Sequence, residues 1–465
     1  MKYWNCKLRQ QRRFWLLLGV LFFWPGLCQS AESQNPEPHM SLQVTEPKNN
    51  GVLTLDSALQ MALDNNPNII QARQRINAQQ AVLGQQMAAY YPSVNVNNYY
   101  RTGTEVNTTA SISTKGAFDT YSSQASVNMT LYNFGKREGT VQAARETVDA
   151  TAFNYTATVN SVVLSVKQSY YGYLQAKAIV KVNQDTVDER QLVVNQTQGF
   201  FDVGTRARID VVRAQANLYS AQADLITAQN AEQVAWVVLK NAIGVRDLPP
   251  RPLVEDLSTP TIAPAYTLDE AREIAYANRP ELKSFEAQKR AQDQVIATAK
   301  RGHLPDIIFD SNYRRANVSN NPATQFGKTF KLDAWPLKPG WQVQVSLNIP
   351  IFDGFRTTNR VQESLSTYYV INAQAEQQRQ QVALDVESSY LNLLAISERL
   401  KANRAAADAA KENLDLASGR YQVGVGSIIE LTDAQNLYTT SETTYVRTVY
   451  DYRIAEAAFQ RAIGR

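Results

Sequence analysis

The sequence predicts an α+β membrane protein that combines long antiparallel helices with a small number of transmembrane β-strands. Three observations lead to this prediction. The chain of 465 residues contains an internal duplication, each half holds a very long proline-free stretch, and a segment of strict period-two alternation precedes each stretch. Long helices with a seven-residue repeat form coiled coils, and alternation over ~9–11 residues is typical of transmembrane barrel strands.

The duplication sets the organisation of the chain. The run TLDSA at 54–58 recurs as TLDEA at 267–271, an offset of 213 residues, and later matches such as Val203-Gly204 with Val423-Gly424 share an offset of 220. A unit of roughly 200 residues is too long for a solenoid repeat. We therefore expect two structural repeats, at 53–244 and 266–465, joined by a proline-rich linker at 245–265.

The first 31 residues have the pattern of a secretory signal peptide, with five basic residues before an apolar run at 14–24. Removing them would change the net charge from +4 to about −1, so the basic balance does not indicate nucleic-acid binding. Both cysteines, Cys6 and Cys28, lie in this leader. Lipidation at Cys28 is an alternative, disfavoured because Leu27 stands where a small residue is needed. Residues 32–52 are polar and should form a flexible arm.

Each repeat is expected to start with a helix and, after two strands, to continue into a long helix at about 136–200 or 356–420. In the first of these, two rows of residues spaced by seven, through Val162 and Val166, lie four residues out of step, which is the spacing of a coiled-coil seam. Each long helix would span on the order of 100 Å. A glycine follows each one and a return helix begins at once, so we expect tight helical hairpins with tips near 204 and 424.

Between the helices the period changes to two. We expect barrel strands at about 94–104, 121–132, 306–316 and 341–350, joined by polar loops at about 102–120 and 316–340; a soluble hairpin is the alternative. Aromatic residues at the strand starts suit a membrane interface. The residues expected to face lipid are Tyr121, Val127, Met129, Leu131, Trp341, Val343, Val345 and Leu347.

Four strands in one chain cannot close a barrel, because the smallest closed barrels have about eight. An open sheet edge is not tolerated in lipid. The chain must then contribute to a shared barrel in a cyclic oligomer, and a trimer would supply twelve strands.

In this order, the features resemble the TolC family of outer-membrane efflux proteins over about 53–465. The resemblance rests on the T-L-D-x-A helix starts, the strand-to-helix junctions at 133–135 (NFG) and 352–354 (FDG), and V-G tips followed by acid-x-x-x-A-Q, each present twice. It implies a TolC-like channel-tunnel, a homotrimer with a 12-stranded β-barrel in the outer membrane and a helical coiled-coil tunnel in the periplasm. It also implies two partners, a periplasmic adaptor (membrane fusion) protein and an inner-membrane pump of the RND or ABC type, and no cofactor or metal.

The resemblance further implies that adaptor hairpins dock at the tips; the alternative is that the glycines only permit the turns. The docking residues would be Val203, Gly204, Thr205, Val423, Gly424 and Val425.

Glu430 and Asp433 lie three residues apart and therefore share a helix face. The resemblance implies that they line the narrowest point of the tunnel, where three copies would form a ring of carboxylates that attracts cations. Asp210 is expected to join them. The alternative for all three acids is a solvated surface face. Gly426 stands where the family's well-studied gate has an arginine, so the closing links should differ; Arg206, Arg208 and Arg213 are the candidate partners.

No enzymatic motif was found, and the two histidines, His39 and His303, stand apart from plausible nucleophiles. We therefore expect a passive exit duct of a tripartite efflux pump. Two alternatives stay open from the sequence. One is the exit duct of a type I protein-secretion system, and the other is a periplasmic coiled-coil scaffold without a pore.

Overall fold

The computed structural model describes residues 51–109, 112–254, 266–320, 323–325, 328–330 and 338–465. The predicted signal peptide, most of the arm at 32–52 and much of the linker at 245–265 lie outside the described residues.

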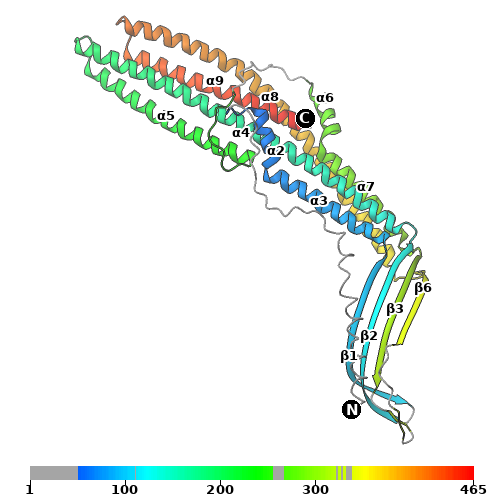
Figure 1. Cartoon of the computed structure of the whole chain (residues 1–465). Coiled ribbons are helices and arrows are strands. Elements are labelled where there is room, and N and C mark those ends of the chain that lie inside the picture. Colours follow the sequence, from blue (N-terminus) through cyan, green and yellow to red (C-terminus); the bar gives the residue numbers. More distant parts are fainter. Residues whose placement is uncertain (1–50, 110–111, 255–265, 321–322, 326–327, 331–337) are drawn as a thin grey trace, which may run out of the picture. The chain divides into compact units, whose positions relative to one another are not determined.

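The same series of elements occurs twice (Figure 1). The first repeat contains α2 Leu55–Asn65, α3 Pro67–Met87, the 3-10 turn η1 Ala88–Tyr90, β1 Ser93–Thr109, β2 Ile112–Tyr132, α4 Lys136–Asp202 and α5 Arg208–Ile243. The second contains α6 Leu268–Asn278, α7 Pro280–Lys300, the 3-10 turn η2 Arg301–His303, β3 Asp306–Asn320, the short β4 Ala323–Gln325 and β5 Lys328–Phe330, β6 Lys338–Asn348, α8 Arg356–Gln422 and α9 Ile428–Ala462.

Local sequence explains where the helices begin and break. Thr54 and Thr267 each form a capping box with the residue three positions later, which satisfies free N–H groups at the starts of α2 and α6. Pro67 and Pro280 occupy the first turns of α3 and α7. The first helix predicted from the sequence, at about 56–90 with a break at Asn66-Pro67, consists of the two helices α2 and α3, because Asn66 has extended backbone before the proline.

The long helices α4 and α8 contain 67 residues each. Val162 and Val166 of the predicted seam are buried in α4, and the residues 220 positions later, Val382 and Val386, are buried in α8. The coiled-coil register read from the sequence is therefore the one that packs in both repeats.

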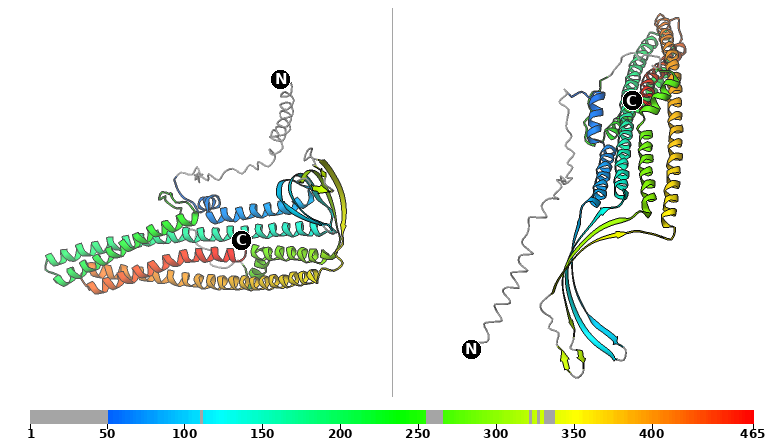
Figure 2. Two further views of the ribbon diagram at one scale, coloured as in Figure 1. Left: turned by 90° about the horizontal axis from the view of Figure 1, so that it is seen from below. Right: turned by 90° about the vertical axis from the view of Figure 1, so that its right-hand side faces the viewer.

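The helices form a wall (Figure 2). Near the strands, α3 packs on α4, α4 on α7, and α7 on α8; toward the tips, α5 packs on α4, α4 on α9, and α9 on α8. Thus α4 and the α7/α9 pair lie inside the wall, whereas α3 and α5 form one edge and α8 forms the other. Among the described residues, no helix is both long enough and apolar enough to cross a membrane.

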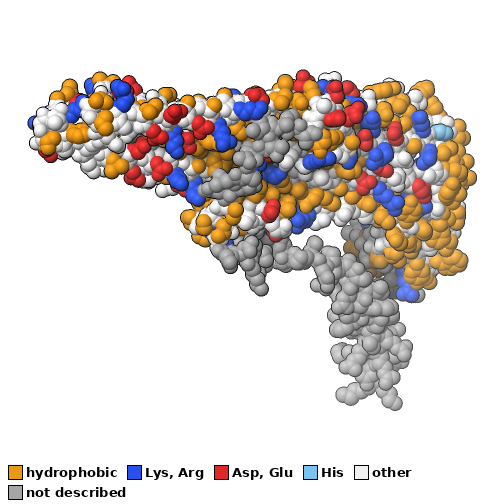
Figure 3. All heavy atoms as spheres, turned by 90° about the horizontal axis from the view of Figure 1, so that it is seen from above, with side chains coloured by type: hydrophobic (Ala, Val, Ile, Leu, Met, Phe, Trp, Pro, Cys, Tyr) orange, Lys and Arg blue, Asp and Glu red, His pale blue; other side chains and the backbone are white. Residues whose placement is uncertain are grey.

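The four long strands make one antiparallel sheet in the order β1-β2-β3-β6, with β1 and β6 at its edges. Register places residues of like polarity side by side: Met129 pairs with Phe309, and Phe309 with Val345. One face of the sheet is consequently apolar, and Trp341 on it is 79% exposed in the single chain. Figure 3 shows hydrophobic side chains gathered at the end of the molecule that carries the strands.

The strands are longer than we predicted, and the expected loops are correspondingly shorter. β1 and β2 stay paired as far as Thr109 opposite Ile112, so the polar segment at 102–120 is mostly strand. In the second repeat β3 continues to Asn320, and β4 pairs with β5 inside the segment predicted as a loop. The alternation of apolar residues marks only the part of a strand with one buried or lipid-facing face, whereas backbone pairing continues beyond it.

Candidate gate at the helical hairpin tips

Both hairpin tips turn through a glycine with left-handed backbone. Gly204 has φ 76° and Gly424 has φ 84°, and the N–H of the next residue bonds back to the end of the helix, Thr205 to the carbonyl of Phe200 and Val425 to that of Arg420. This is the hydrogen-bond pattern of a helix C-cap that glycine favours. Val203, Val423 and Val425 are each at least 70% exposed at these turns.

An arginine of the first tip binds the backbone of the second tip. Arg206 donates from Nη2 to the carbonyl oxygen of Gly426 at 2.7 Å and makes a longer contact of 3.4 Å to that of Gly424. Its guanidinium also lies 5.2 Å from the centre of the Tyr421 ring. A charged donor on a carbonyl is stronger than a neutral hydrogen bond, so this side chain links the α4/α5 hairpin to the α8/α9 hairpin.

Tyr421 anchors the other side of this link. Its side chain is fully buried, and its hydroxyl shares a hydrogen bond of 2.9 Å with Thr197 of α4. The ring of Phe200 packs edge-on against it at 5.9 Å. An apolar cluster that includes Leu414, Ile428 and Leu431 surrounds it, so the two hairpins share a small core just inside the tips.

Gly426 packs closely against the end of α8. A Cβ at this position would lie 3.0 Å from the backbone nitrogen of Tyr421 and 3.1 Å from the carbonyl carbon of Arg420. A side chain at this position would therefore require the turn or the end of α8 to shift by a few tenths of an ångström, and the link to this tip is made by Arg206 of the opposite tip.

The predicted carboxylates differ in their partners. Glu430 forms an ion pair of 3.0 Å with Arg420, in which both side chains are partly exposed, and its backbone N–H is capped by Ser427. Among the described residues, the side chains of Asp433 and Asp210 make no ion pair, and neither do Arg208 and Arg213. Thus Arg206 bonds to carbonyls rather than to an acid, and the Arg420–Glu430 pair was not predicted from the sequence.

A row of polar contacts joins the two hairpins above the apolar core at the tips. From the tips upward, Arg190 donates to Asn436 at 2.6 Å, Thr186 meets Thr439 at 3.2 Å, and Gln175 donates to Asp451 at 3.1 Å. Within hairpins, buried residues such as Leu218 and Ala221 of α5 face α4. We call this row of contacts between the hairpins the polar seam.

Charge is buried in this polar seam. Arg190 is 8% exposed, and its Nε has no partner among the described residues; burial lowers its pKa. Burial raises the pKa of the neighbouring Glu189; Arg190 opposes this effect, and Asp415 and Asp185 add to it. No sequence pattern predicted the hydrogen bond between Arg190 and Asn436, because the two residues lie 246 positions apart along the chain.

The chain matches a family model twice, once in each repeat. The model describes the outer membrane efflux protein, and it matches residues 58–245 and 271–465. The chain belongs to the outer membrane efflux protein family. The matched segments begin at positions related by the first offset of the duplication and end at positions related by the second.

Individual relatives agree with this assignment. The chain is 26% identical to the outer membrane protein TolC of Vibrio cholerae over 317 residues, 67% of this chain and 69% of that protein. It is 25% identical to protein CyaE of Bordetella pertussis over 427 residues, 89% and 84% of the two chains. The toluene efflux pump outer membrane protein TtgC of Pseudomonas putida is 22% identical over 395 residues, 83% and 78%.

Solved structures share the fold. The outer-membrane channel OprN superposes with a TM-score of 0.71 at 18% identity, over 88% of this chain and 89% of that one. CusC superposes with a TM-score of 0.73 at 18% identity, over 91% and 96%. The predicted channel-tunnel fold is thus confirmed. This outer membrane efflux protein belongs to a class of outer-membrane channels that work with periplasmic adaptors and inner-membrane pumps.

Proposed function

We propose that three copies of this efflux protein form the outer-membrane exit duct of a tripartite efflux pump, and that the hairpin tips are its periplasmic gate and docking end. The observation that carries the proposal is that one chain leaves open edges on both its sheet and its helical wall, at β1 with α3 and α5 on one side and at β6 with α8 on the other.

The α5 edge carries an exposed coiled-coil seam. Ile209, Val212, Tyr219 and Ile226 are all more than half exposed, and with Ala216 and Ala223 they follow alternating steps of three and four along the helix. A second row, which includes Leu218, is already buried against α4. A helix with two apolar seams packs between two neighbours, so the exposed seam is expected to meet another chain.

The α8 edge offers a matching surface. Leu384, Leu391 and Leu416 are 54–63% exposed, and the first two are seven residues apart. Because the two edges differ, the contact between copies is head-to-tail, which forms a ring when the rotation between copies closes. The same ring would pair β6 of one copy with β1 of the next and leave no free strand edge in lipid, giving a closed sheet of twelve strands from three copies.

In this assembly the tips hold the duct closed. Arg206 ties the α5 side of the tip to the α8/α9 side within each copy, and Asp433, Glu430 and Asp210 supply negative charge where the helices converge. The exposed valines Val203, Val423 and Val425 beside Gly204, Thr205 and Gly424 form the surface for an adaptor. Separation of the hairpins along their polar seam would widen the duct.

The names of two relatives support efflux, and the exit duct of a type I secretion system stays open as the alternative. Two matched proteins of Pseudomonas putida are described as a toluene efflux pump protein and an antibiotic efflux pump protein. We infer that this chain performs no catalytic step, and that the energy for transport comes from the inner-membrane pump.

Cysteine pairs across the proposed edges test the assembly. Val212 lies four residues after the start of α5 and Leu416 six residues before the end of α8, so the two lie at similar heights above the tips. Oxidation of a Val212→Cys, Leu416→Cys double variant should give a covalent trimer on denaturing gels. The control pairs Leu416→Cys with Leu192→Cys, which is exposed on α4 inside the wall. Only monomers, or equal crosslinking in both variants, would contradict the trimer.

A further inference from the structure

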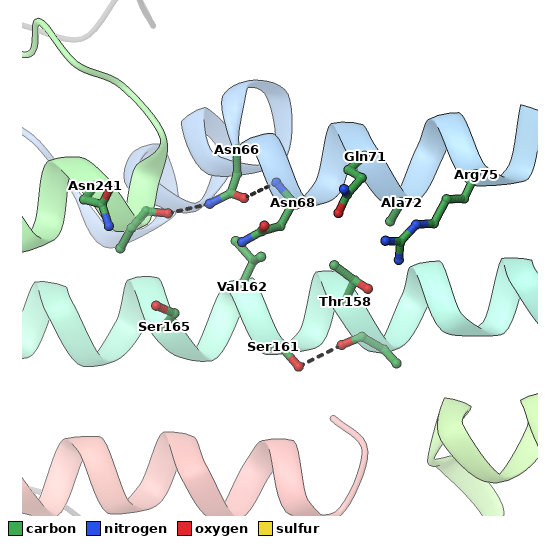
Figure 4. Close-up of a pocket in the computed structure, with 12 residues that line it drawn as sticks. Asn66, Asn68, Gln71, Ala72, Arg75, Thr158, Ser161, Val162, Ser165 and Asn241 are labelled. Carbon is green, nitrogen blue, oxygen red and sulfur yellow. Dashed lines mark hydrogen bonds between the residues drawn. The ribbon is translucent and has the colours of Figure 1, made fainter.

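A polar cavity of about 450 Å³ lies where α3 and α4 meet the C-terminal end of α5, which is the end of that helix remote from its tip (Figure 4). Its floor includes the buried side chains of Asn66, Val162 and Ala242. Around them stand amides, hydroxyls and one charged group, Arg75, which reaches from α3 toward Thr158 of α4. No carboxylate lines the cavity.

The corresponding place in the second repeat is filled by four charged side chains. Arg279 is 2% exposed and binds Asp385 at 2.5 Å and Glu281 at 3.4 Å; Arg461 contacts Glu281 at 3.6 Å. This ion network fastens the start of α7 to α8 and α9. The position of each of these four residues has an equivalent position in the first repeat, at the offset of the duplication, and each equivalent residue lies at the first-repeat cavity.

All four counterparts are short and neutral. Arg279 corresponds to Asn66, Glu281 to Asn68, Asp385 to Ser165 and Arg461 to Asn241, and the four neutral residues all line the cavity. The exchange removes two positive and two negative groups together with most of their volume. The cavity is therefore the space that charged side chains occupy in one repeat and that small polar side chains leave open in the other.

At one further position the first repeat is charged and the second repeat is neutral. Arg75 lines the cavity, whereas its counterpart in the second repeat is the neutral Gln288. Among the described residues, Arg75 has no ion pair and no side-chain hydrogen bond. The first repeat thus has no carboxylate lining this junction and carries an exposed guanidinium without an ion pair among the described residues, whose planar donors fit oxyanions.

We propose that this α3–α4 cavity binds a small oxyanion, a phosphate or carboxylate group, with Arg75 as its charged ligand and the side chains of Asn68 and Thr158 as neutral partners. The anion would supply beside Asn68 the negative charge that Glu281 supplies in the second repeat. It would join α3 to α4 and stiffen the junction at Asn66, where α2 ends and α3 begins.

The test uses the assembled full-length protein in detergent, with inorganic phosphate and acetate as probes at constant ionic strength. Equilibrium dialysis with labelled phosphate should show saturable binding, acetate should compete if a carboxylate also fits, and saturation should raise the thermal midpoint. Arg75→Gln, the residue of the second repeat, should weaken binding by about tenfold or more. Arg73→Gln is the matched control, because Arg73 is exposed on α3 as Arg75 is, but does not line the cavity.

A second variant transfers the ion network into the first repeat, as Asn66→Arg, Asn68→Glu, Ser165→Asp and Asn241→Arg. If the cavity is an anion site, this variant should lose phosphate binding and the phosphate-dependent rise in midpoint. The absence of saturable binding of either probe to the wild-type protein, or equal binding to the Arg75→Gln and wild-type proteins, would overturn the proposal even if the fourfold variant failed to fold.

Discussion

The guanidinium of Arg206 on the first hairpin tip donates a hydrogen bond of 2.7 Å to the carbonyl oxygen of Gly426 on the second tip. The two residues stand 220 positions apart, the offset of the duplication, so they occupy equivalent places in the two repeats. One repeat supplies the cation, and the other supplies the carbonyl oxygen of a glycine that packs closely against the end of α8. The link is therefore a product of divergence between two copies of one hairpin.

Replacing Arg206 with Ala should loosen the closed tip. The substitution removes a charge-assisted hydrogen bond and a cation–π contact, worth roughly 1–3 kcal/mol together. We expect a higher single-channel conductance or open fraction in planar bilayers. Arg208→Ala is the control, because Arg208 makes no ion pair among the described residues. Identical conductance of wild type and Arg206→Ala would show that the link does not hold the gate.

The two acids after the second tip should differ in their effect on ion selectivity. Arg420 partly neutralises Glu430 at 3.0 Å, whereas Asp433 has no ion pair among the described residues. Asp433→Asn should therefore reduce cation preference more than Glu430→Gln does. Replacing both acids with Ala should widen the pore and abolish its preference for cations. Reversal potentials in a salt gradient measure this. An unchanged cation preference in the double variant would show that neither residue lines the constriction.

Two glycines with similar backbone angles should differ in their tolerance of alanine. Gly204 has φ 76° with open space around it, so Gly204→Ala should cost only the left-handed backbone strain, about 1–2 kcal/mol. Gly244 has φ 86°, and a Cβ there would lie 2.8 Å from Cα of Asn66. Gly244→Ala should cost roughly 2–5 kcal/mol, because steric overlap is added. Equal shifts of the thermal midpoint would contradict this account.

The polar seam should become less stable as pH rises past the ordinary carboxyl range. Because burial raises the pKa of Glu189 in the folded protein, the folded state holds this proton more tightly than the unfolded state does. The contribution of Glu189 to stability therefore falls as pH rises from its ordinary value near 4.5 through the raised one.

A Glu189→Gln variant should raise the thermal midpoint at neutral pH and reduce its dependence on pH above 4.5. Asp188→Asn is the matched control, since Asp188 is the neighbouring acid and is exposed. A lower midpoint for Glu189→Gln at pH 7 would mean that attraction between Glu189 and Arg190 outweighs the cost of burial.

Much of the fold could be predicted because it repeats a local pattern. The seam through Val162 and Val166 gave the register of α4 and, at the repeat offset, that of α8 at Val382 and Val386. Alternation at Val127 and Met129 placed strand β2, but its start at Ile112 was missed because pairing continues through a polar segment.

The candidate site was harder to predict because its contacts join residues far apart in sequence. The positions of the tips follow from Gly204 and Gly424, yet no local signal shows that Arg206 reaches a carbonyl instead of Asp210 or Glu430. The bond between Arg190 and Asn436 depends on how two hairpins are placed side by side, which is decided by tertiary packing.

The central claim, that the tips join this efflux protein to a pump, is tested most directly by crosslinking in living cells. Thr205→Cys and Val425→Cys would be introduced separately, with Leu192→Cys on α4 as the control. Mass spectrometry would then identify the trapped proteins. We predict capture of a periplasmic adaptor from both tip positions and little from the control. Capture of copies of this chain alone, or equal capture from all three positions, would contradict the exit-duct account.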